Sequence, residues 1–352
     1  MKLLNVTIKA SNLINCSIVL LLKHFWLSLL LLPNPYCELI KMKKSILLHF
    51  GIYPIILLSM IFWGMSFVWT SIVFKYYHPI TTIFIRLVIS TFILSVFIYL
   101  SGKFEKLRKE DRGLFMLSAL FNPFLYFLGE NFGLQNTSPT ISAVIIATIP
   151  VFTPVVAFIA LKERLSWLNI SGIFISFFGI GVMLVNPDFS LGASPFGVFL
   201  LLGAVTSAVI YSIFLKKLTR KYSSLTIITY QNALGVMYFL PLFLFFDYEH
   251  FITVAPTREL ISALLQLSFF ASSLAFIFFT MTVKELGVSR TNVFSNLIPV
   301  FTAIFSAIFI SEIFSVFKIT GMVIVIAGVL ISQKKRNIFK DLSTNSHKSD
   351  TN

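Results

Sequence analysis

The chain has 352 residues, of which 57% are hydrophobic, 12% are charged and 40 are Phe. A soluble domain cannot bury so much apolar surface, so the composition excludes a soluble globular protein. The formal net charge is +14, but the Lys and Arg residues are dispersed over many loops, which argues against a nucleic-acid partner.

Residues 1–41 precede the main apolar region and do not share its pattern. The segment LINCSIVLLLKHFWLSLLLL has the length of a membrane span, but Lys23 and His24 lie at its centre. A charge there costs about 2.5–3.5 kcal/mol on insertion scales. A signal peptide also fits poorly, because no small-residue cleavage site follows cleanly. We treat residues 1–41 as an N-terminal extension of doubtful origin and keep two interpretations: upstream sequence misread as coding, or an interfacial helix.

Ten apolar runs follow between residues 52 and 333, separated by short loops. A helix needs about 20 mostly apolar residues to cross a bilayer, and the runs approach that length. The sequence therefore predicts an all-α, polytopic membrane protein with ten transmembrane helices. Their predicted ranges are 52–72, 79–100, 114–134, 139–160, 168–186, 196–215, 224–246, 260–283, 289–311 and 316–333. The polar tail 334–352 is predicted to be disordered and cytoplasmic.

Lys and Arg are distributed unevenly between alternate loops. One set of loops, with the tail, holds nearly all of them, whereas the other set holds only Lys75, Arg258 and Lys318. Because cytoplasmic loops collect Lys and Arg, the first set is predicted to face the cytoplasm. The N- and C-termini of the ten-helix core then both lie on the cytoplasmic side.

The pentapeptide IPVFT begins at Ile149 and again at Ile298, so its two copies lie 149 residues apart. Each half of the core holds five predicted helices, and because five is odd the second half enters the membrane from the opposite side. We therefore predict two inverted five-helix repeats, residues 42–186 and 195–333. The same shift aligns Ile159 with Ile308, Glu163 with Glu312, Ser166 with Ser315, Gly172 with Gly321 and Gly179 with Gly328.

The earlier helices repeat more faintly, at a shift of 144 residues. WGMSF from Trp63 then aligns with SAVIY from Ser207, and Arg86 aligns with Tyr230, so the halves are related but not equivalent. Inverted repeats recur in secondary transporters, because two related half-molecules can exchange shapes and so alternate access to a central site. The duplication therefore favours a transporter over a structural scaffold.

Several short motifs occur in a fixed order along the core. They are WGxSF from Trp63 to Phe67, Arg86 in the second helix, a Pro-containing fourth helix that runs into KER from Lys162 to Arg164, and spaced Gly residues in the fifth helix, Gly172 and Gly179. Together with the duplication, these motifs resemble the EamA branch of the drug/metabolite transporter superfamily over about residues 50–333. The resemblance implies a ten-helix carrier that moves, and often exports, small organic metabolites across a bacterial inner membrane. It names no substrate.

Pro150 and Pro299 lie near the middles of the fourth and ninth predicted helices. Each removes a helical hydrogen bond and frees a carbonyl four residues earlier. Two interpretations stay open: kinks needed for packing, or breaks on either side of a central substrate-binding cavity. In the second interpretation, the nearby hydrogen-bonding candidates are Thr148, Thr153, Asn296 and Thr302.

Polar and aromatic residues inside the apolar runs are further candidates for the lining of a cavity. Buried amides cost about 1–3 kcal/mol unless they are partnered. Gln231 and Asn232 in the seventh helix are therefore candidate substrate ligands, as is Tyr211 in the sixth. Most aromatic residues of so Phe-rich a chain are expected to pack or to face lipid, and the remaining candidates are Trp63, Tyr230 and Gln266.

Arg86 and Glu130 are charged residues inside predicted helices. At 1.5 Å per residue they lie about 11 Å and about 6 Å below the outer ends of their helices, so they can pair. A fixed salt bridge that sets helix packing is one interpretation. In the other, Arg86 either binds an anionic group of the substrate or holds Glu130 ionised until substrate or a proton displaces it, and Glu130 is the coupling site that exchanges a proton.

The sequence carries no pattern that favours an enzyme. The five His residues show no metal-ligand spacing, there is no P-loop, and both Cys16 and Cys37 lie in the N-terminal extension. We expect no cofactor and no metal; the expected partners are a small-molecule metabolite, the lipid bilayer and, as candidate coupling ions, protons. The function predicted is a secondary transporter that exports a metabolite, and the alternative is a membrane-embedded receptor or assembly factor that binds without transport.

Overall fold

The structure is a computed structural model that describes residues 35–102, 105–153, 167–185 and 192–333. The chain divides into two units, residues 1–54 and 55–352, and the bundle discussed below belongs to the second. The predictions for the tail 334–352, for the KER motif and for most of the extension 1–41 lie outside the described residues.

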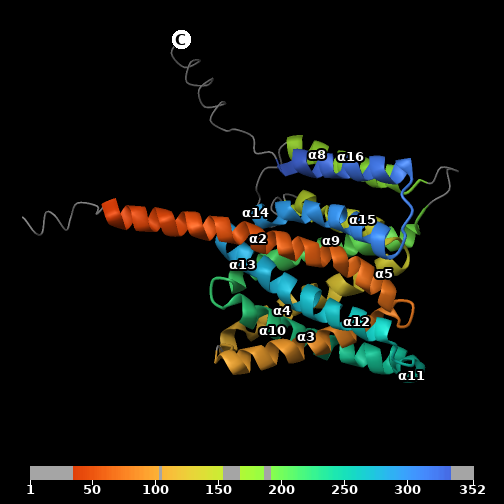
Figure 1. The fold of residues 1–352 in the computed structure, drawn as a ribbon, viewed down its shortest axis with the longest axis horizontal. Coiled ribbons are helices and arrows are strands. Elements are labelled where there is room, and N and C mark those ends of the chain that lie inside the picture. The colour runs from red at the N-terminus through yellow and green to blue at the C-terminus, as the bar shows by residue number, and fades with distance from the viewer. Residues whose placement is uncertain (1–34, 103–104, 154–166, 186–191, 334–352) are drawn as a thin grey trace, which may run out of the picture. The chain divides into compact units, whose positions relative to one another are not determined.

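All elements of the described residues are helices or single helical turns (Figure 1). The α-helix α2 contributes its residues from Ile55 onward to the second unit. In chain order the bounds are α2 Pro35–Val73, α3 Pro79–Ser101, η1 Lys109–Asp111, α4 Arg112–Ala119, η2 Leu120–Leu125, α5 Tyr126–Gln135, α6 Pro139–Ile146, α8 Trp167–Met183, α9 Pro195–Leu218, α10 Ser224–Leu242, η3 Phe243–Asp247, α11 Tyr248–Thr253, α12 Arg258–Gln266, η4 Leu267–Ala275, α13 Phe276–Leu286, α14 Val288–Val293, η5 Phe294–Leu297, α15 Ile298–Phe309 and α16 Val316–Gln333.

Seven helical stretches in the described residues are long and apolar enough to cross a membrane. They coincide with the first, second, third, sixth, seventh, eighth and ninth predicted spans. Three shorter apolar helices, Pro139–Thr153, Ile170–Met183 and Val316–Ser332, coincide with the fourth, fifth and tenth. The all-helical polytopic fold is confirmed, and seven of the ten predicted spans reach full spanning length within the part of the chain that the structure describes.

Several spans are interrupted rather than continuous. The third contains the π-helical turn η2, where Asn122 leaves the helical backbone conformation, and the seventh and eighth contain the π-helical turns η3 and η4. The ninth changes to a 3-10 turn at η5, and in the fourth α6 ends at Ile146 before the helix resumes at Ile149. Such irregular turns inside helices are frequent at functional sites.

The helices α8 and α16 pack through glycines that the repeat aligns. Gly172 lies against Gly328, and Gly179 lies against Gly321. The shift of 149 residues maps Gly172 onto Gly321 and Gly179 onto Gly328, so it exchanges one contact for the other. The two helices are therefore antiparallel and symmetric about an axis between them, as inverted repeats predict.

Ser176 and Val325 mark the position of that axis. They are equivalent under the shift of 149 residues, and the Ser176 hydroxyl donates to the Val325 carbonyl at 3.5 Å. A residue contacts its own equivalent only near a twofold axis, because the two copies are brought together there.

Replacing Gly179 by Leu is expected to destabilise the pair of α8 and α16. A Cβ at Gly179 would lie 2.7 Å from the backbone nitrogen of Val325 and 3.0 Å from the carbonyl oxygen of Gly321, so the helices would have to separate. Overpacking of this kind costs about 1–3 kcal/mol. A Cβ at Gly181 on the same helix would meet no atom within 4 Å, so Gly181→Leu is the matched control. Thermal unfolding in detergent should show a lower Tm for Gly179→Leu only, and equal Tm values would contradict the packing role.

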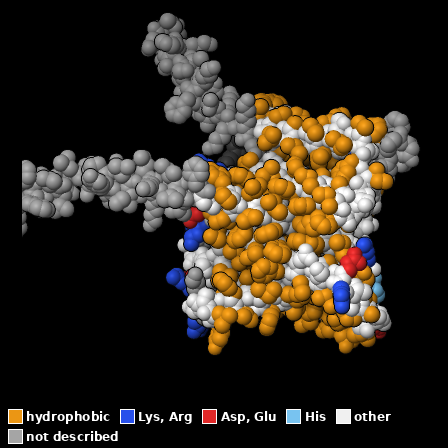
Figure 2. All heavy atoms as spheres, in the orientation of Figure 1, with side chains coloured by type: hydrophobic (Ala, Val, Ile, Leu, Met, Phe, Trp, Pro, Cys, Tyr) orange, Lys and Arg blue, Asp and Glu red, His pale blue; other side chains and the backbone are white. Residues whose placement is uncertain are grey.

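Contacts between loops occur within the two predicted sets and support the alternation of the spans. At the predicted outer end, Lys75 pairs with Glu259 at 3.2 Å. At the predicted cytoplasmic end, Lys221 pairs with Asp111 at 2.6 Å. Figure 2 shows hydrophobic side chains over the visible face of the bundle, with charged side chains toward its two ends.

Glu312, the repeat equivalent of Glu163, joins the two halves in the turn between α15 and α16. Its carboxylate accepts hydrogen bonds from Thr140 Oγ1 at 2.8 Å and from Lys318 Nζ at 2.9 Å. Burial raises the pKa of Glu312, but hydrogen bonds from Ser138, Lys318 and Thr140 outweigh burial and leave the pKa below its ordinary value. The carboxylate is therefore ionised at neutral pH, and its contribution to stability is lost as the pH falls through that lowered pKa.

Candidate functional site

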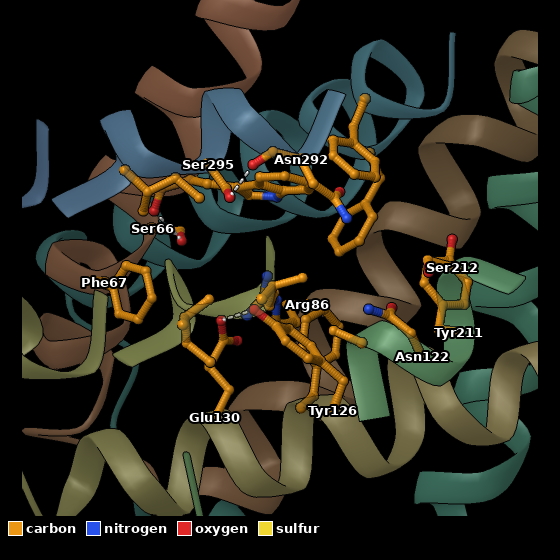
Figure 3. Close-up of a pocket in the computed structure, with 18 residues that line it drawn as sticks. Ser66, Phe67, Arg86, Asn122, Tyr126, Glu130, Tyr211, Ser212, Asn292 and Ser295 are labelled. Carbon is orange, nitrogen blue, oxygen red and sulfur yellow. Dashed lines mark hydrogen bonds between the residues drawn. The ribbon is translucent and has the colours of Figure 1, made fainter. Parts of the chain in front are cut away.

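A cavity of about 60 Å³ lies between the two repeat halves, part-way along the spans. Side chains from α2, α3, α5, α9, α13 and α14 surround it, together with the interrupted regions at η2, Ile149 and η5 (Figure 3). Irregular backbone at membrane depth is tolerated where it lines a cavity. Pockets for drug-sized ligands measure about 300–1,000 Å³, so this cavity admits a small ligand only after it widens.

Arg86 on α3 is the buried cation of this cavity. It is 2% exposed, and its Nε donates to Ser272 Oγ of η4 at 2.7 Å. Its guanidinium carbon lies 4.3 Å from the centre of the Phe127 ring, an interaction worth up to about 2 kcal/mol when desolvated. No described residue accepts a hydrogen bond from the two Nη groups, so the guanidinium keeps donors for an anionic ligand.

Glu130 on α5 is the carboxylate of the same cavity. Tyr126, one helical turn earlier, donates its hydroxyl to Glu130 Oε1 at 2.7 Å. Figure 3 shows Tyr126 and Glu130 together on one side of the cavity, close to Arg86. No other side chain of the described residues donates to this carboxylate, so its remaining lone pairs can accept from a cationic ligand.

Within the described part of the chain, no ion pair joins Arg86 to Glu130. The two side chains are therefore not in direct contact, but their opposite charges attract each other, so the interpretation as a salt bridge that sets helix packing stays a prediction. Both line one cavity, and buried charges that attract without direct contact are only partly compensated. A ligand that carries both an anionic and a cationic group would satisfy the two side chains at once.

Aromatic rings form much of the cavity wall. The ring of Trp63 lies 5.0 Å from those of Phe276 and Phe279 on α13, measured between centroids. Phe127 packs edge-to-face against Phe276 at 6.1 Å. Such apolar walls lower the local polarity, which strengthens electrostatic interactions between a ligand and the charged side chains.

Gln231 on α10 lies behind the cavity rather than on its surface. Its Oε1 accepts from the Tyr211 hydroxyl at 3.1 Å, and its Nε2 donates to Ser118 Oγ at 2.6 Å. Tyr211 does line the cavity. The amide therefore fixes the direction of a lining hydroxyl instead of facing a ligand directly.

Asn232, the next residue on α10, also does not line the cavity and lies behind Arg86. Its Nδ2 donates to Ser90 Oγ at 2.8 Å and to the carbonyl of Ser272 at 3.1 Å. Ser272 in turn accepts from Arg86 Nε through its hydroxyl. The amide thus holds the residue that orients the guanidinium.

Replacing Asn232 by Leu is expected to weaken transport by about tenfold, since a net hydrogen bond contributes about 0.5–1.5 kcal/mol and an unsatisfied group costs more. The change should raise KM more than it lowers the maximal rate, because Arg86 loses its fixed orientation. Gln266, whose amide donates only to Ser262 Oγ on an exposed surface, provides the control variant Gln266→Leu. The measurement is substrate flux in proteoliposomes, which gives KM and the maximal rate for each variant. Equal KM values for both variants would exclude a positioning role for Asn232.

The two copies of IPVFT each bring a helix break to the cavity. Ile149 and Ile298, the first residues of the copies, line it. Pro150 and Pro299 follow directly and are buried without belonging to the lining. Pro299 lies in the first turn of α15, after η5.

The four hydrogen-bonding residues proposed beside the prolines do not belong to the lining either. Thr148 and Thr153 donate their hydroxyls to carbonyls of their own helix, at 2.6 Å and 3.1 Å. Thr302 donates to the carbonyl of Gly64 on α2 at 3.0 Å, and so ties the ninth span to the first. Asn296 is buried, and neither atom of its amide has a partner in the described residues.

Several polar lining residues were not proposed from the sequence: Ser66, Asn122, Tyr126, Ser212, Asn292 and Ser295. Asn122 had a usable signal, because an Asn-Pro pair inside an apolar run predicts a break in a helix. Asn292 follows a basic loop and carries no such signal, since a polar residue near a helix end is ordinary. Trp63 lines the cavity as expected, whereas Tyr230 and Gln266 do not.

Residues 51–185 and residues 195–333 each match the model of the EamA-like transporter family. The chain belongs to this family. It is therefore a multi-pass membrane transporter, in agreement with the apolar helices and with the resemblance noted from the motifs.

Relatives of this EamA-like chain carry transporter names. An uncharacterized transporter of Archaeoglobus fulgidus is 24% identical over 282 residues, covering 80% of this chain and 98% of its own length. The uncharacterized transporter YyaM of Bacillus subtilis is 28% identical over 292 residues, covering 80% and 93%. A probable terminal-alkyne amino-acid exporter of Streptantibioticus cattleyicolor is 22% identical over 228 residues, covering 65% and 75%. One solved crystal structure, 14% identical, aligns with a TM-score of 0.60 over 80% of this chain and 98% of its own, which shows a common fold.

Proposed function

We propose that this protein is a secondary transporter that exports a small zwitterionic metabolite of the amino-acid class, by alternating access between its two halves. The observation that carries the proposal is the shared cavity in which Arg86 and Glu130 face the same space without an ion pair between them. A carboxylate matches the free guanidinium donors, and an ammonium group matches the Glu130 carboxylate.

The pseudo-twofold symmetry of α8 and α16 supports the alternating-access part of the proposal, because inverted halves can exchange conformations around a fixed central site. The name of the Streptantibioticus relative supports the substrate class and the direction of transport. The excess of Lys and Arg in one set of loops supports cytoplasmic termini for the core, in a bacterial inner membrane.

Glu130 is proposed as the group through which a proton gradient drives accumulation. A carboxylate that shares a cavity with the substrate can bind a proton while the cavity is open to one side of the membrane and release it while the cavity is open to the other side. Displacement of the proton by the ammonium group of the substrate would link the two fluxes without any covalent chemistry, so the proposed activity is transport and not catalysis.

Purified protein reconstituted in liposomes tests the proposal through counterflow of a panel of radiolabelled amino acids. We expect uptake of at least one labelled amino acid against an internal pool, and faster accumulation when a pH gradient is imposed. Binding detected by ligand-induced thermal stabilisation, without counterflow of any panel member, would instead favour the receptor or assembly-factor function. Absence of both binding and counterflow across the panel would overturn the substrate class.

A further inference from the structure

The cavity has a second polar region, at the opposite end from Arg86 and Glu130. Asn292 and Ser295 come from the ninth span near its predicted cytoplasmic end, and Ser212 comes from the same end of α9. Figure 3 shows Asn292 and Ser295 on the far side of the cavity from Glu130. This end carries no charged side chain among the described lining residues, so we call it the neutral pole.

The hydroxyl groups of the neutral pole already use their hydrogens inside the protein. Ser212 Oγ donates to the Val209 carbonyl at 2.6 Å, and Ser295 Oγ donates to the Asn292 carbonyl at 2.6 Å. These hydroxyl oxygens therefore face a ligand as hydrogen-bond acceptors.

The amide of Asn292, by contrast, has a hydrogen-bond donor that is not used inside the protein. The residue is 4% exposed, it lines the cavity, and its Nδ2 has no hydrogen-bond partner among the described residues. Asn122 lines the cavity as well, is 7% exposed, and makes no side-chain hydrogen bond within the described part of the chain. Buried donors of native proteins are nearly always satisfied, so the Asn292 amide requires an acceptor that a ligand would supply, and the unbonded amide of Asn122 is a second candidate donor.

We propose that Asn292, with Asn122, binds a neutral hydrogen-bonding group at the distal end of the substrate, of the hydroxyl or carboxamide class. Such a group offers an oxygen to the amide donors and a hydrogen to the hydroxyl oxygens of Ser212 and Ser295. This inference rests on the proposed function, since it takes the charged end of the substrate to lie at Arg86 and Glu130. A second charge at the distal end would meet no counter-charge and would be rejected by its desolvation cost.

The test compares near-isosteric amino acids that differ in this distal group: L-threonine with L-valine, and L-asparagine with L-leucine. Their kcat/KM values are measured by counterflow in proteoliposomes for the wild type, Asn292→Leu and Asn292→Ala. Asn296→Leu is the matched control, because Asn296 lies one turn further on, is also buried and lacks side-chain partners among the described residues, but does not line the cavity. We expect the wild type to favour the polar member of each pair, and Asn292→Leu to lower that preference by about tenfold while Asn296→Leu leaves it unchanged.

The outcomes separate this inference from the proposed function. If the wild type neither binds nor transports any amino acid of the full panel, the proposed function fails and the neutral pole fails with it. If it transports other members of the panel but none of these four, only the neutral pole is overturned. If the wild type transports them but prefers the apolar members, or if Asn292→Leu and Asn292→Ala keep its preference, only the neutral pole is overturned. If Asn292→Leu does not insert, the ratio of kcat/KM values for the polar and apolar amino acids is taken from Asn292→Ala. A wild type that prefers the apolar members overturns the inference without any variant.

Discussion

Arg86→Ala is expected to reduce transport by about 30-fold to 5,000-fold, because truncating one member of a desolvated charge contact costs about 2–5 kcal/mol. The substrate carboxylate would lose its only cationic partner among the described lining residues, and Glu130 would be left as an uncompensated buried charge. Arg86→Lys keeps the charge but not the planar fork that contacts both Ser272 and the face of Phe127, so we expect it to restore only part of the activity.

Counterflow in proteoliposomes measures the effect, with insertion checked by size-exclusion chromatography. Lys75→Ala is the matched control, since it also removes one cation at the same end of the bundle, but from an exposed pair with Glu259. We expect this control to transport normally, because exposed ion pairs contribute about 0–1 kcal/mol. A folded Arg86→Ala protein with normal kinetics would show that the guanidinium does not contact the substrate.

Glu130→Gln is expected to abolish accumulation driven by a pH gradient while leaving exchange of substrate measurable. The amide keeps the size of the side chain and can still accept from Tyr126, but it cannot take up or release a proton. Substrate affinity should fall as well, because an ammonium group loses the charge-assisted part of its contact.

The measurement compares uptake with and without an imposed pH gradient, and then substrate exchange at equal pH. Glu312→Gln serves as the control carboxylate: it lies in the turn between α15 and α16, paired with Lys318, outside the cavity. This control should lower the thermal stability and keep the response to the pH gradient. Gradient-driven accumulation by a correctly folded Glu130→Gln protein would place the coupling site elsewhere, and a failure of insertion in this variant alone would support a packing role.

Composition and the internal repeat were enough to predict the membrane spans and their inverted arrangement. Apolar length predicts spans because unpaired backbone groups cannot face lipid, and the alignment of Gly172 with Gly321 and of Gly179 with Gly328 predicted an inverted pair that the contacts of α8 and α16 display. Arg86 and Glu130 were recognisable as candidates because a charge inside an apolar run is rare and costly. Each of these predictions needs only the type of one residue or one alignment of the chain with itself.

Which polar residues share the cavity was decided by tertiary structure. Gln231 and Asn232 resemble lining residues in the sequence, yet neither lines the cavity. Gln231 accepts from Tyr211, and Asn232 donates to Ser90 and to the carbonyl of Ser272. Asn122 and Asn292 lie far apart in the chain and face the same space. The physical reason is that lipid and protein interior are both apolar, so the periodicity of a membrane helix does not separate its lipid-facing side from its cavity-facing side. Only the packing of distant helices, and the breaks at η2 and η5 that turn their side chains inward, places these residues against one another.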